Sequence, residues 1–169
     1  DVSVENIFDE VDDGDGVITE GAGATFSDGI WIGSLTEVSQ DEGYWVIVSS
    51  DITLEVFNAD PISYDDDGEV IYDIHYGPNL ISYPYQTAQT LDDALGDTAD
   101  NLYAIASENM AALNTDNGFL GSLTSFEGGK GYWMLTEQNF SFTFNGNEEG
   151  LSRVEQSSLR EVPELYSYS

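Results

Sequence analysis

Cysteine is absent from this chain of 169 residues. The absence excludes disulfide bonds, thiolate catalysis and zinc sites built on cysteine ligands. It leaves the cellular compartment open, because many exported bacterial proteins also lack cysteine. With 40% hydrophobic and 12% aromatic residues, the chain can still bury a core. Its length suits one ordinary domain or two small ones.

Basic residues are almost absent as well. Three lysine and arginine residues stand against 33 acidic residues, which gives a formal net charge of −30. Such a charge repels phosphate backbones and anionic membrane surfaces, so we expect no nucleic-acid partner. It also repels itself, so screening salt or bound cations should favour the compact state. A saline exterior suits this composition better than a dilute one.

Long apolar runs are missing too. No stretch approaches the roughly 20 apolar residues that a membrane helix needs, so no membrane insertion is expected. The sequence begins at Asp1 without an initiator methionine or a charged-then-apolar leader, and we expect a processed product or an excised piece.

An internal repeat organises what is present. The stretch GSLTEVSQDEGYW at residues 33–45 matches GSLTSFEGGKGYW at residues 121–133 with seven identities in thirteen positions. The offset of 88 continues downstream, and with one residue less it matches SVENIF from Ser3 to TLDDAL from Thr90. The sequence therefore predicts a tandem duplication in which both units share one small fold.

Reading both copies together predicts a mainly β fold. Each unit should hold one short helix, beginning at Ser3 or Thr90, and about four strands in a small antiparallel sheet or barrel. The segments 17–26 and 104–113 should each be extended, and alternating apolar residues predict strands at 52–57 and 140–144.

The boundaries of the units follow from the repeat. We assign residues 1–59 to the first unit, residues 60–77 to an inter-unit segment, residues 78–146 to the second unit and residues 147–169 to a linker that begins another module. The second unit is preceded by a probable strand, NLISYPY, which has no counterpart before Ser3. An open edge on the first unit is therefore expected, filled by strand addition from a neighbouring chain or from the tail near ELYSYS, or else left by truncation.

The Gly-Tyr-Trp motif of both copies is a candidate ligand site. The GGKG stretch of the second copy lacks the trailing serine or threonine of a phosphate-binding loop, and the first copy replaces it with QDEG. The shared glycine fits a tight turn or a close backbone approach. Neighbours in a strand point to opposite faces, so one aromatic should enter the core and the other should face out. Tyr44 and Tyr132 are the candidates for an outward surface contact, such as stacking on a sugar ring.

Acidic clusters raise the question of calcium. The stretch DEVDDGDGVITE does not fit the register of an EF-hand loop, because Val11 and Ala22 fall where oxygen ligands are required. A looser calcium site built from carboxylates remains an alternative to a solvated acidic turn. Its candidate ligands are Asp9, Asp12, Asp13 and Asp15.

The sequence contains few residues of the kinds that carry out catalysis. His75 is the only histidine and lies in a probable strand between aromatic residues, and no nucleophile elbow or His-Glu-x-x-His pair occurs. We expect no catalytic residues and no cofactor other than the calcium just considered.

The stretches NLISYPYQ, LDDALGD, AIASENMAAL and GSLTSFEGGKGYW follow one another between residues 79 and 133. This succession resembles a repeat module of large secreted or surface proteins of marine bacteria and of virion structural proteins of marine phages. The resemblance implies a non-enzymatic structural or assembly module, with other proteins or further copies bound through strand edges. The alternative is an adhesin domain that recognises glycans or a host cell surface.

Overall fold

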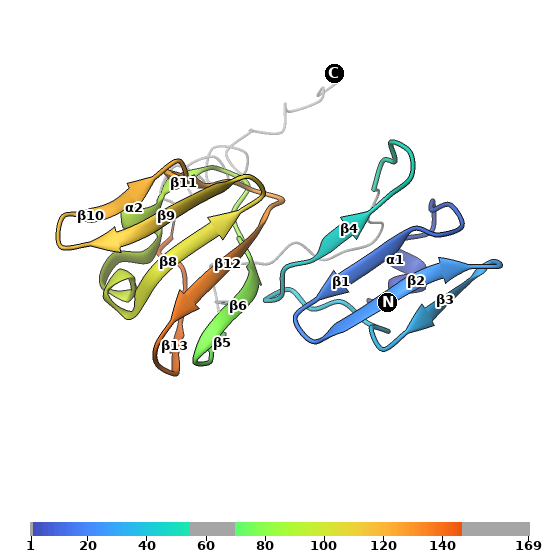
Figure 1. Ribbon diagram of the computed structural model, residues 1–169, viewed down its shortest axis with the longest axis horizontal. Coiled ribbons are helices and arrows are strands. Elements are labelled where there is room, and N and C mark those ends of the chain that lie inside the picture. The colour runs from blue at the N-terminus through green and yellow to red at the C-terminus, as the bar shows by residue number, and fades with distance from the viewer. Residues whose placement is uncertain (1, 55–69, 147–169) are drawn as a thin grey trace, which may run out of the picture.

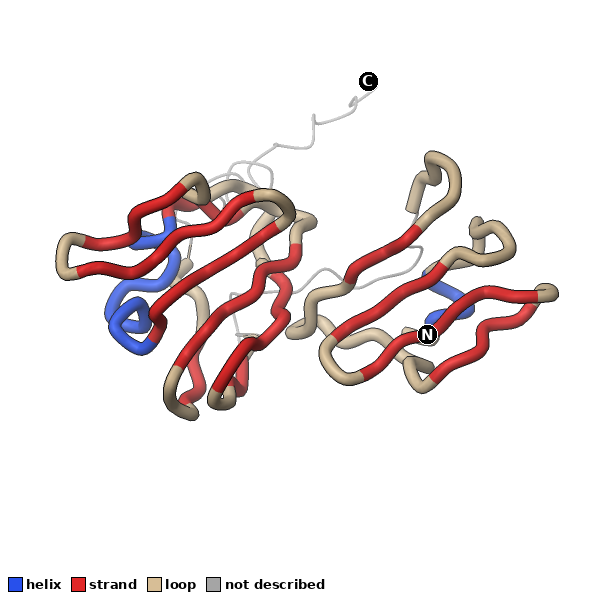
Figure 2. Tube along the Cα trace, viewed as in Figure 1, coloured by secondary structure: helices blue, strands red, loops and turns tan. Residues whose placement is uncertain are grey.

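The computed structural model describes residues 2–54 and 70–146, and all statements below concern these residues. The protein is mainly β, with antiparallel sheets and few short helices (Figures 1 and 2). None of the helices in this part of the chain is long and apolar enough to cross a membrane. We call residues 2–54 the first unit and residues 70–146 the second unit.

The first unit is a four-stranded sheet with one short helix behind it (Figure 1). The strand order is β3-β2-β1-β4, so β4 and β3 form the two edges. The elements are α1 (Val4–Ile7), β1 (Gly16–Thr19), β2 (Ala22–Ser27), β3 (Ile30–Gly33) and β4 (Trp45–Ile47).

The second unit is larger, because three sheets share its core. The main sheet has the order β10-β9-β8-β12-β6, and the pairs β11-β7 and β13-β5 form two smaller ladders. The elements are β5 (Tyr72–Ile74), β6 (Gly77–Ser82), β7 (Gln89–Thr90), α2 (Leu91–Leu95), the 3₁₀ helix η1 (Gly96–Asn101), β8 (Leu102–Ser107), β9 (Met110–Thr115), β10 (Gly118–Gly121), β11 (Ser125–Phe126), β12 (Gly131–Thr136) and β13 (Phe140–Phe142).

The two main sheets share one register at an offset of 88. The β1–β2 pair Val17↔Ala24 recurs as Ile105↔Ala112 between β8 and β9. The described pairs of β2 with β3 and of β1 with β4 recur in the same way in β9–β10 and β8–β12. The shared register is a structural observation in favour of the tandem duplication, which stays a prediction about descent.

Each unit has its own hydrophobic core. The first core is small and lies between the sheet and α1, with Val4, Phe8, Val17, Ala24 and Leu35 buried. The second core is much larger and contains an aromatic cluster in which the rings of Phe126 and Tyr132 lie 4.7 Å apart, edge to face. The second unit therefore holds most of the buried apolar surface.

The helices begin where the N-cap pattern predicted. Thr90 caps α2, since its side chain accepts a hydrogen bond from the backbone N–H of Asp93 at 3.1 Å. Ser3 is the N-cap residue of α1, but its side chain makes no capping bond. Both helices last only four or five residues, as expected.

Two expectations about the strands were wrong. The extended segments 17–26 and 104–113 are hairpins, because Gly21 and Asn109 occupy the same turn position with positive φ. Residues 52–54 form no strand, and the rest of the expected strand 52–57 lies outside the described residues. Residues 70–77, which we assigned to the inter-unit segment, contain the strand β5 and contribute buried side chains to the second core.

Candidate functional site

The front face of the first sheet, seen in Figure 1 on the side away from α1, is apolar and exposed. Strand alternation assigns each residue to a face. Ile18 pairs with Trp45, Gly16 pairs with Ile47, and Val17 between them points back to α1. Ile30 and Ile32, through their partners Ser27 and Thr25 on β2, lie on the same front face.

Large side chains on this face are strongly exposed. Ile30, Ile32 and Ile47 are 61%, 58% and 56% exposed, and Ile18 and Trp45 lie beside them. We call Ile18, Ile30, Ile32, Trp45 and Ile47 the isoleucine face. Isolated exposed apolar residues are ordinary, but several large ones on one sheet face, with only the small Gly23, Thr25 and Ser27 of β2 between them, are typical of an interaction surface.

The corresponding face of the second unit has fewer large exposed apolar side chains. Leu120 stands where Ile32 stands in the first unit and is 73% exposed, and Leu113 beside it is 60% exposed. Nearer the middle of the sheet the side chains are small, since Ala104 and Ala106 occupy the positions of Gly16 and Ile18. The broadest cluster of large exposed side chains is therefore on the first unit.

One edge of the isoleucine face is open. In the second unit, β6 lies beside β12, whereas the equivalent side of β4 has no strand among the described residues. Val46 and Val48 are exposed there together with Trp45 and Ile47. Unpaired strand edges present free N–H and C=O groups, which favour pairing with another chain.

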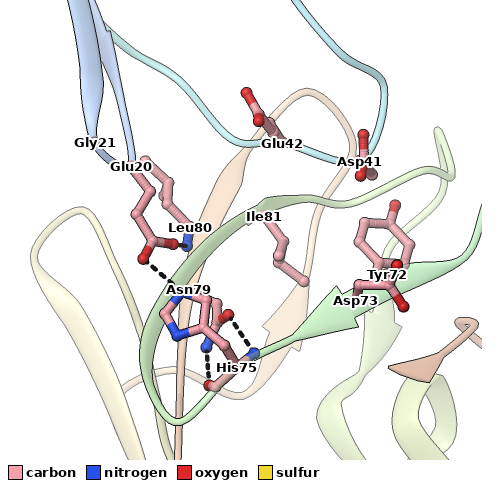
Figure 3. A pocket seen from close by; sticks show the side chains of 10 residues that line it. All are labelled: Glu20, Gly21, Asp41, Glu42, Tyr72, Asp73, His75, Asn79, Leu80 and Ile81. Carbon is pink, nitrogen blue, oxygen red and sulfur yellow. Dashed lines mark hydrogen bonds and ion pairs between the residues drawn. The ribbon is translucent and has the colours of Figure 1, made fainter. Parts of the chain in front are cut away.

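A second candidate is a cleft between the two units, with a volume of about 410 Å³ (Figure 3). Its lining contains four carboxylates and the single histidine, and its floor is formed by β5 and β6. We call this the inter-unit cleft, and its lining is Glu20, Gly21, Asp41, Glu42, Tyr72, Asp73, His75, Asn79, Leu80 and Ile81.

Hydrogen bonds between the two units connect the residues that line the cleft. Glu20, in the turn between β1 and β2, approaches His75 and also accepts a weak bond from the N–H of Leu80 at 3.4 Å (Figure 3). Gly43 donates its N–H to the carbonyl of Leu80 at 3.0 Å. A Cβ on Gly43 would lie 2.7 Å from the carbonyl oxygen of Ile81, so this glycine makes a close backbone approach, whereas a Cβ on Gly131 would have no contact below 3.5 Å.

His75 is fully engaged in hydrogen bonds. Its Nδ1 lies 2.8 Å from the carbonyl of Tyr76, and its Nε2 lies 2.7 Å from Oε1 of Glu20. Both partners accept hydrogen bonds, so the geometry favours the doubly protonated ring. The carbonyl of Tyr76, and after it the carboxylate of Glu20, raise the pKa of His75 above its ordinary value. The bond of the ring to Glu20 joins the two units.

The tyrosines proposed as outward contacts point inward. Tyr132 is only 1% exposed, and Tyr44 is half-buried against the first core. Their hydroxyls accept the N–H groups of Glu127 at 2.7 Å and of Ser39 at 2.6 Å, so each ring can enter its core while its oxygen stays bonded. Burial raises the pKa of Tyr44 to about 12. Of the first aromatic pair, Trp45 is the exposed member, so the predicted orientation was wrong.

The structure does not bring the four aspartates proposed as calcium ligands together in one cluster, and calcium binding stays a prediction. Across residues 2–54 and 70–146, no group of three acidic or histidine side chains could hold an ion. Asp15 is buried and accepts the N–H groups of Asp12 at 2.9 Å and Ser49 at 2.8 Å. Asp13 accepts the N–H of Asp28 at 2.7 Å. These carboxylates fix backbone turns, which is a common structural use of aspartate.

Sequence reasoning missed the isoleucine face, although a signal was present. The stretches IWI in β3 and WVI in β4 are apolar at every position, without the alternation of a strand that has one wet face. Such a strand is either covered on both sides or exposed for a partner. Only the structure shows that the front side is uncovered.

Comparison with known proteins adds no relative. No family model matches the chain, and no curated protein and no solved structure matches it either.

Proposed function

We propose that this chain is a non-enzymatic structural or assembly module of an extracellular or virion-surface protein. The observation that carries the proposal is the isoleucine face, which lies beside the open edge of β4. Burial of such a face releases roughly 25 cal/mol per Å² of apolar surface, which makes it suitable for packing against further copies of the module.

The charge of the chain supports the proposed setting. A net charge of −30 opposes association of identical chains in dilute salt, and screening at marine or extracellular ionic strength removes most of that repulsion. The isoleucine face itself contains no charged residue. Association should therefore strengthen as salt is raised.

The bonding of His75 supports a non-enzymatic role. Both ring nitrogens are held by Tyr76 and Glu20, so the ring has no free nitrogen to act as a general base. The resemblance to repeat modules of marine surface and virion proteins points the same way.

The proposal is tested by sedimentation velocity over a range of protein concentrations at low and high salt. We expect the wild-type chain to associate with rising concentration in 0.5 M NaCl. The triple variant Ile30→Thr/Ile32→Thr/Ile47→Thr should stay monomeric with an unchanged melting temperature, because exposed substitutions rarely shift stability by more than about 0.5 kcal/mol. The matched control is Leu113→Thr/Leu120→Thr on the second unit. A wild-type chain that stays monomeric in all conditions would contradict the proposal.

The alternative function is that of an adhesin domain for glycans or a host cell surface, and the inter-unit cleft favours it. Carboxylates such as Asp73 and the amide of Asn79 are groups that bind sugar hydroxyls, and Trp45 offers an exposed ring nearby on the first unit. The side-chain amide of Asn79 is already bonded to the backbone of His75 and Gly77, which lowers its capacity for a ligand. Glycan-array binding that is lost in Asp73→Asn would establish this alternative.

A further inference from the structure

The register shared by the two sheets defines what is missing beside β4. In the second unit β12 pairs with β6 through Trp133↔Leu80 and Met134↔Asn79. At the common offset of 88, Trp133 and Met134 correspond to Trp45 and Val46 of β4. A strand with the pattern of β6, antiparallel to β4, would therefore complete the first sheet as β6 completes the second.

The backbone of β4 is oriented to receive that strand. Phe26 donates its N–H to the carbonyl of Asp15 at 2.8 Å, so Asp15, which directly precedes β1, and Val17 within it are the residues that bond to β2. The alternate residues Gly16 and Ile18 then bond to Ile47 and Trp45 of β4. Val46 between them directs its N–H and C=O away from β1, toward the open edge.

A second copy of the β6 pattern is present in the sequence. Residues 78–83 read PNLISY, and residues 163–168 read PELYSY, with four identities in six positions at an offset of 85. The shared residues are Pro78/Pro163, Leu80/Leu165, Ser82/Ser167 and Tyr83/Tyr168. The tail thus carries the residues of the strand that β4 lacks.

The order of the chain says which sheet such a strand completes. β6 follows the first unit in sequence, yet it completes the sheet of the second unit. By the same order, residues 163–168, which follow the second unit, would complete the sheet of a further unit and not that of either unit in their own chain. Between separate chains, the unit that offers an open edge of this kind is the first unit of another copy.

We propose that residues 163–168 of one copy add as an antiparallel strand to β4 of a second copy, joining the chains head to tail. This proposal deepens the proposed assembly function and rests on it. The expected register places Leu165 opposite Trp45 and Glu164 opposite Val46. Such a contact is heterologous and does not close on itself, so it builds linear chains of copies.

Two local features fit the proposed pairing. Leu80 directs its N–H to Glu20 and its carbonyl to Gly43, so Asn79 and Ile81 are the residues of β6 that bond to β12. Pro78 shares the orientation of Leu80, so its missing N–H costs the β12 ladder nothing, and Pro163 would be tolerated at the same place. Residue Glu42 already forms a bridge to Ile81, which limits the acceptor edge to residues 45–48.

The test uses proline as an edge blocker in the full chain. The acceptor variant Val46→Pro removes the N–H that faces the open edge, and Val46→Thr is its matched control. The donor variant Glu164→Pro/Tyr166→Pro removes the two N–H groups that would bond to β4, and Ser157→Pro elsewhere in the tail is its control. Melting temperatures measured in parallel identify any variant that fails to fold, and a synthetic peptide of residues 162–169 then probes the folded acceptor directly.

Mixing the two variants gives the decisive reading in sedimentation velocity at 0.5 M NaCl. We expect each variant alone to be monomeric, both controls to associate like the wild type, and an equal mixture to form a dimer and nothing larger. We expect the labelled peptide to bind the wild-type chain at least tenfold more tightly than Val46→Pro, and a scrambled peptide not to bind.

Three results would overturn the inference. If Val46→Pro associates as the wild type does while the isoleucine-face variant does not, the strand pairing fails and the assembly function stands. If the wild type is monomeric and both proline variants melt lower by the same amount, the tail binds its own chain. If no form associates and no peptide binds, the pairing and the assembly function fail together.

Discussion

Glu20 and His75 meet across the boundary between the two units, with 2.7 Å between Oε1 of the glutamate and Nε2 of the imidazole. They are 55 residues apart in sequence, with Glu20 in the turn between β1 and β2 and His75 between β5 and β6. Since the other ring nitrogen of His75 faces the carbonyl of Tyr76, the protonated ring holds both contacts at once. The junction of the units therefore depends on a group that titrates near neutral pH.

The first prediction concerns pH. The pKa of His75 is raised in the folded protein, so its contribution to stability is fully present below its unfolded pKa of about 6.5 and is lost as pH rises through the folded pKa. The stability difference between the wild type and His75→Gln should therefore shrink as pH rises above about 6.5. Thermal melts from pH 5.5 to 9 measure it, with Glu20→Gln as the matched variant. A difference that stays constant over this range would contradict the account.

The second prediction concerns the buried tyrosines. Tyr132→Phe leaves the N–H of Glu127 without its acceptor and should lower the free energy of unfolding by about 1 kcal/mol. Tyr44→Phe removes the equivalent bond to Ser39 and should cost less, because Tyr44 is more exposed. Urea unfolding measures both. Equal stability of Tyr132→Phe and the wild type would show that the hydroxyl is not structurally used.

The third prediction concerns Gly33 and Gly121, the glycines that end β3 and β10. A Cβ on Gly33 would lie 2.1 Å from the carbonyl oxygen of Gly23, and a Cβ on Gly121 would lie 2.1 Å from that of Ala111. Alanine at either position forces the backbone apart and should cost about 1 to 3 kcal/mol. Chemical denaturation is the measurement, with Gly14→Ala as a contrast where nothing lies within 4 Å but φ is positive. Unchanged stability of Gly121→Ala would contradict the close approach of Gly121 to the backbone of Ala111.

The fourth prediction concerns Asp15. The N–H of Asp12, which bonds to the carboxylate, is the main cause that lowers the pKa of Asp15, and burial opposes it. Its stabilisation is present above the unfolded pKa and is lost as pH falls through the folded pKa, so Asp15→Asn should flatten the acid limb of the stability curve. Chelator and added calcium should leave the wild-type melting temperature unchanged. A calcium-dependent rise in the melting temperature that Asp15→Asn abolishes would support calcium binding at this site.

Much of the fold could be predicted from the sequence because the repeat let two weak patterns support each other. GSL followed by GYW at one spacing predicted a strand at each stretch, and both copies have them, as β3 and β4 in the first unit and β10 and β12 in the second. The hairpins within 17–26 and 104–113 were missed because a turn of Glu20-Gly21 or Glu108-Asn109 is short and lacks a strong turn pair. Alternation along one strand gave no warning of those reversals.

The candidate sites were harder to predict, because they depend on what covers a face. Periodicity shows that Tyr44 and Trp45 point to opposite sides, but not which side is the core. That choice depends on the bond that the Tyr44 hydroxyl accepts from the N–H of Ser39 and on where α1 packs. The inter-unit cleft could not be predicted from the sequence either, because Glu20 and His75 meet only through tertiary structure.

The central claim is that β4 of the first unit is an interface between chains. Hydrogen exchange of residues 45–48, measured in dilute and in concentrated wild-type protein at 0.5 M NaCl, tests it most directly. The account predicts that the amide of Val46 exchanges rapidly in dilute protein and is protected at least tenfold in concentrated protein, while amides of β8 in the second sheet exchange alike in both. Equal exchange of Val46 at both concentrations would contradict the claim.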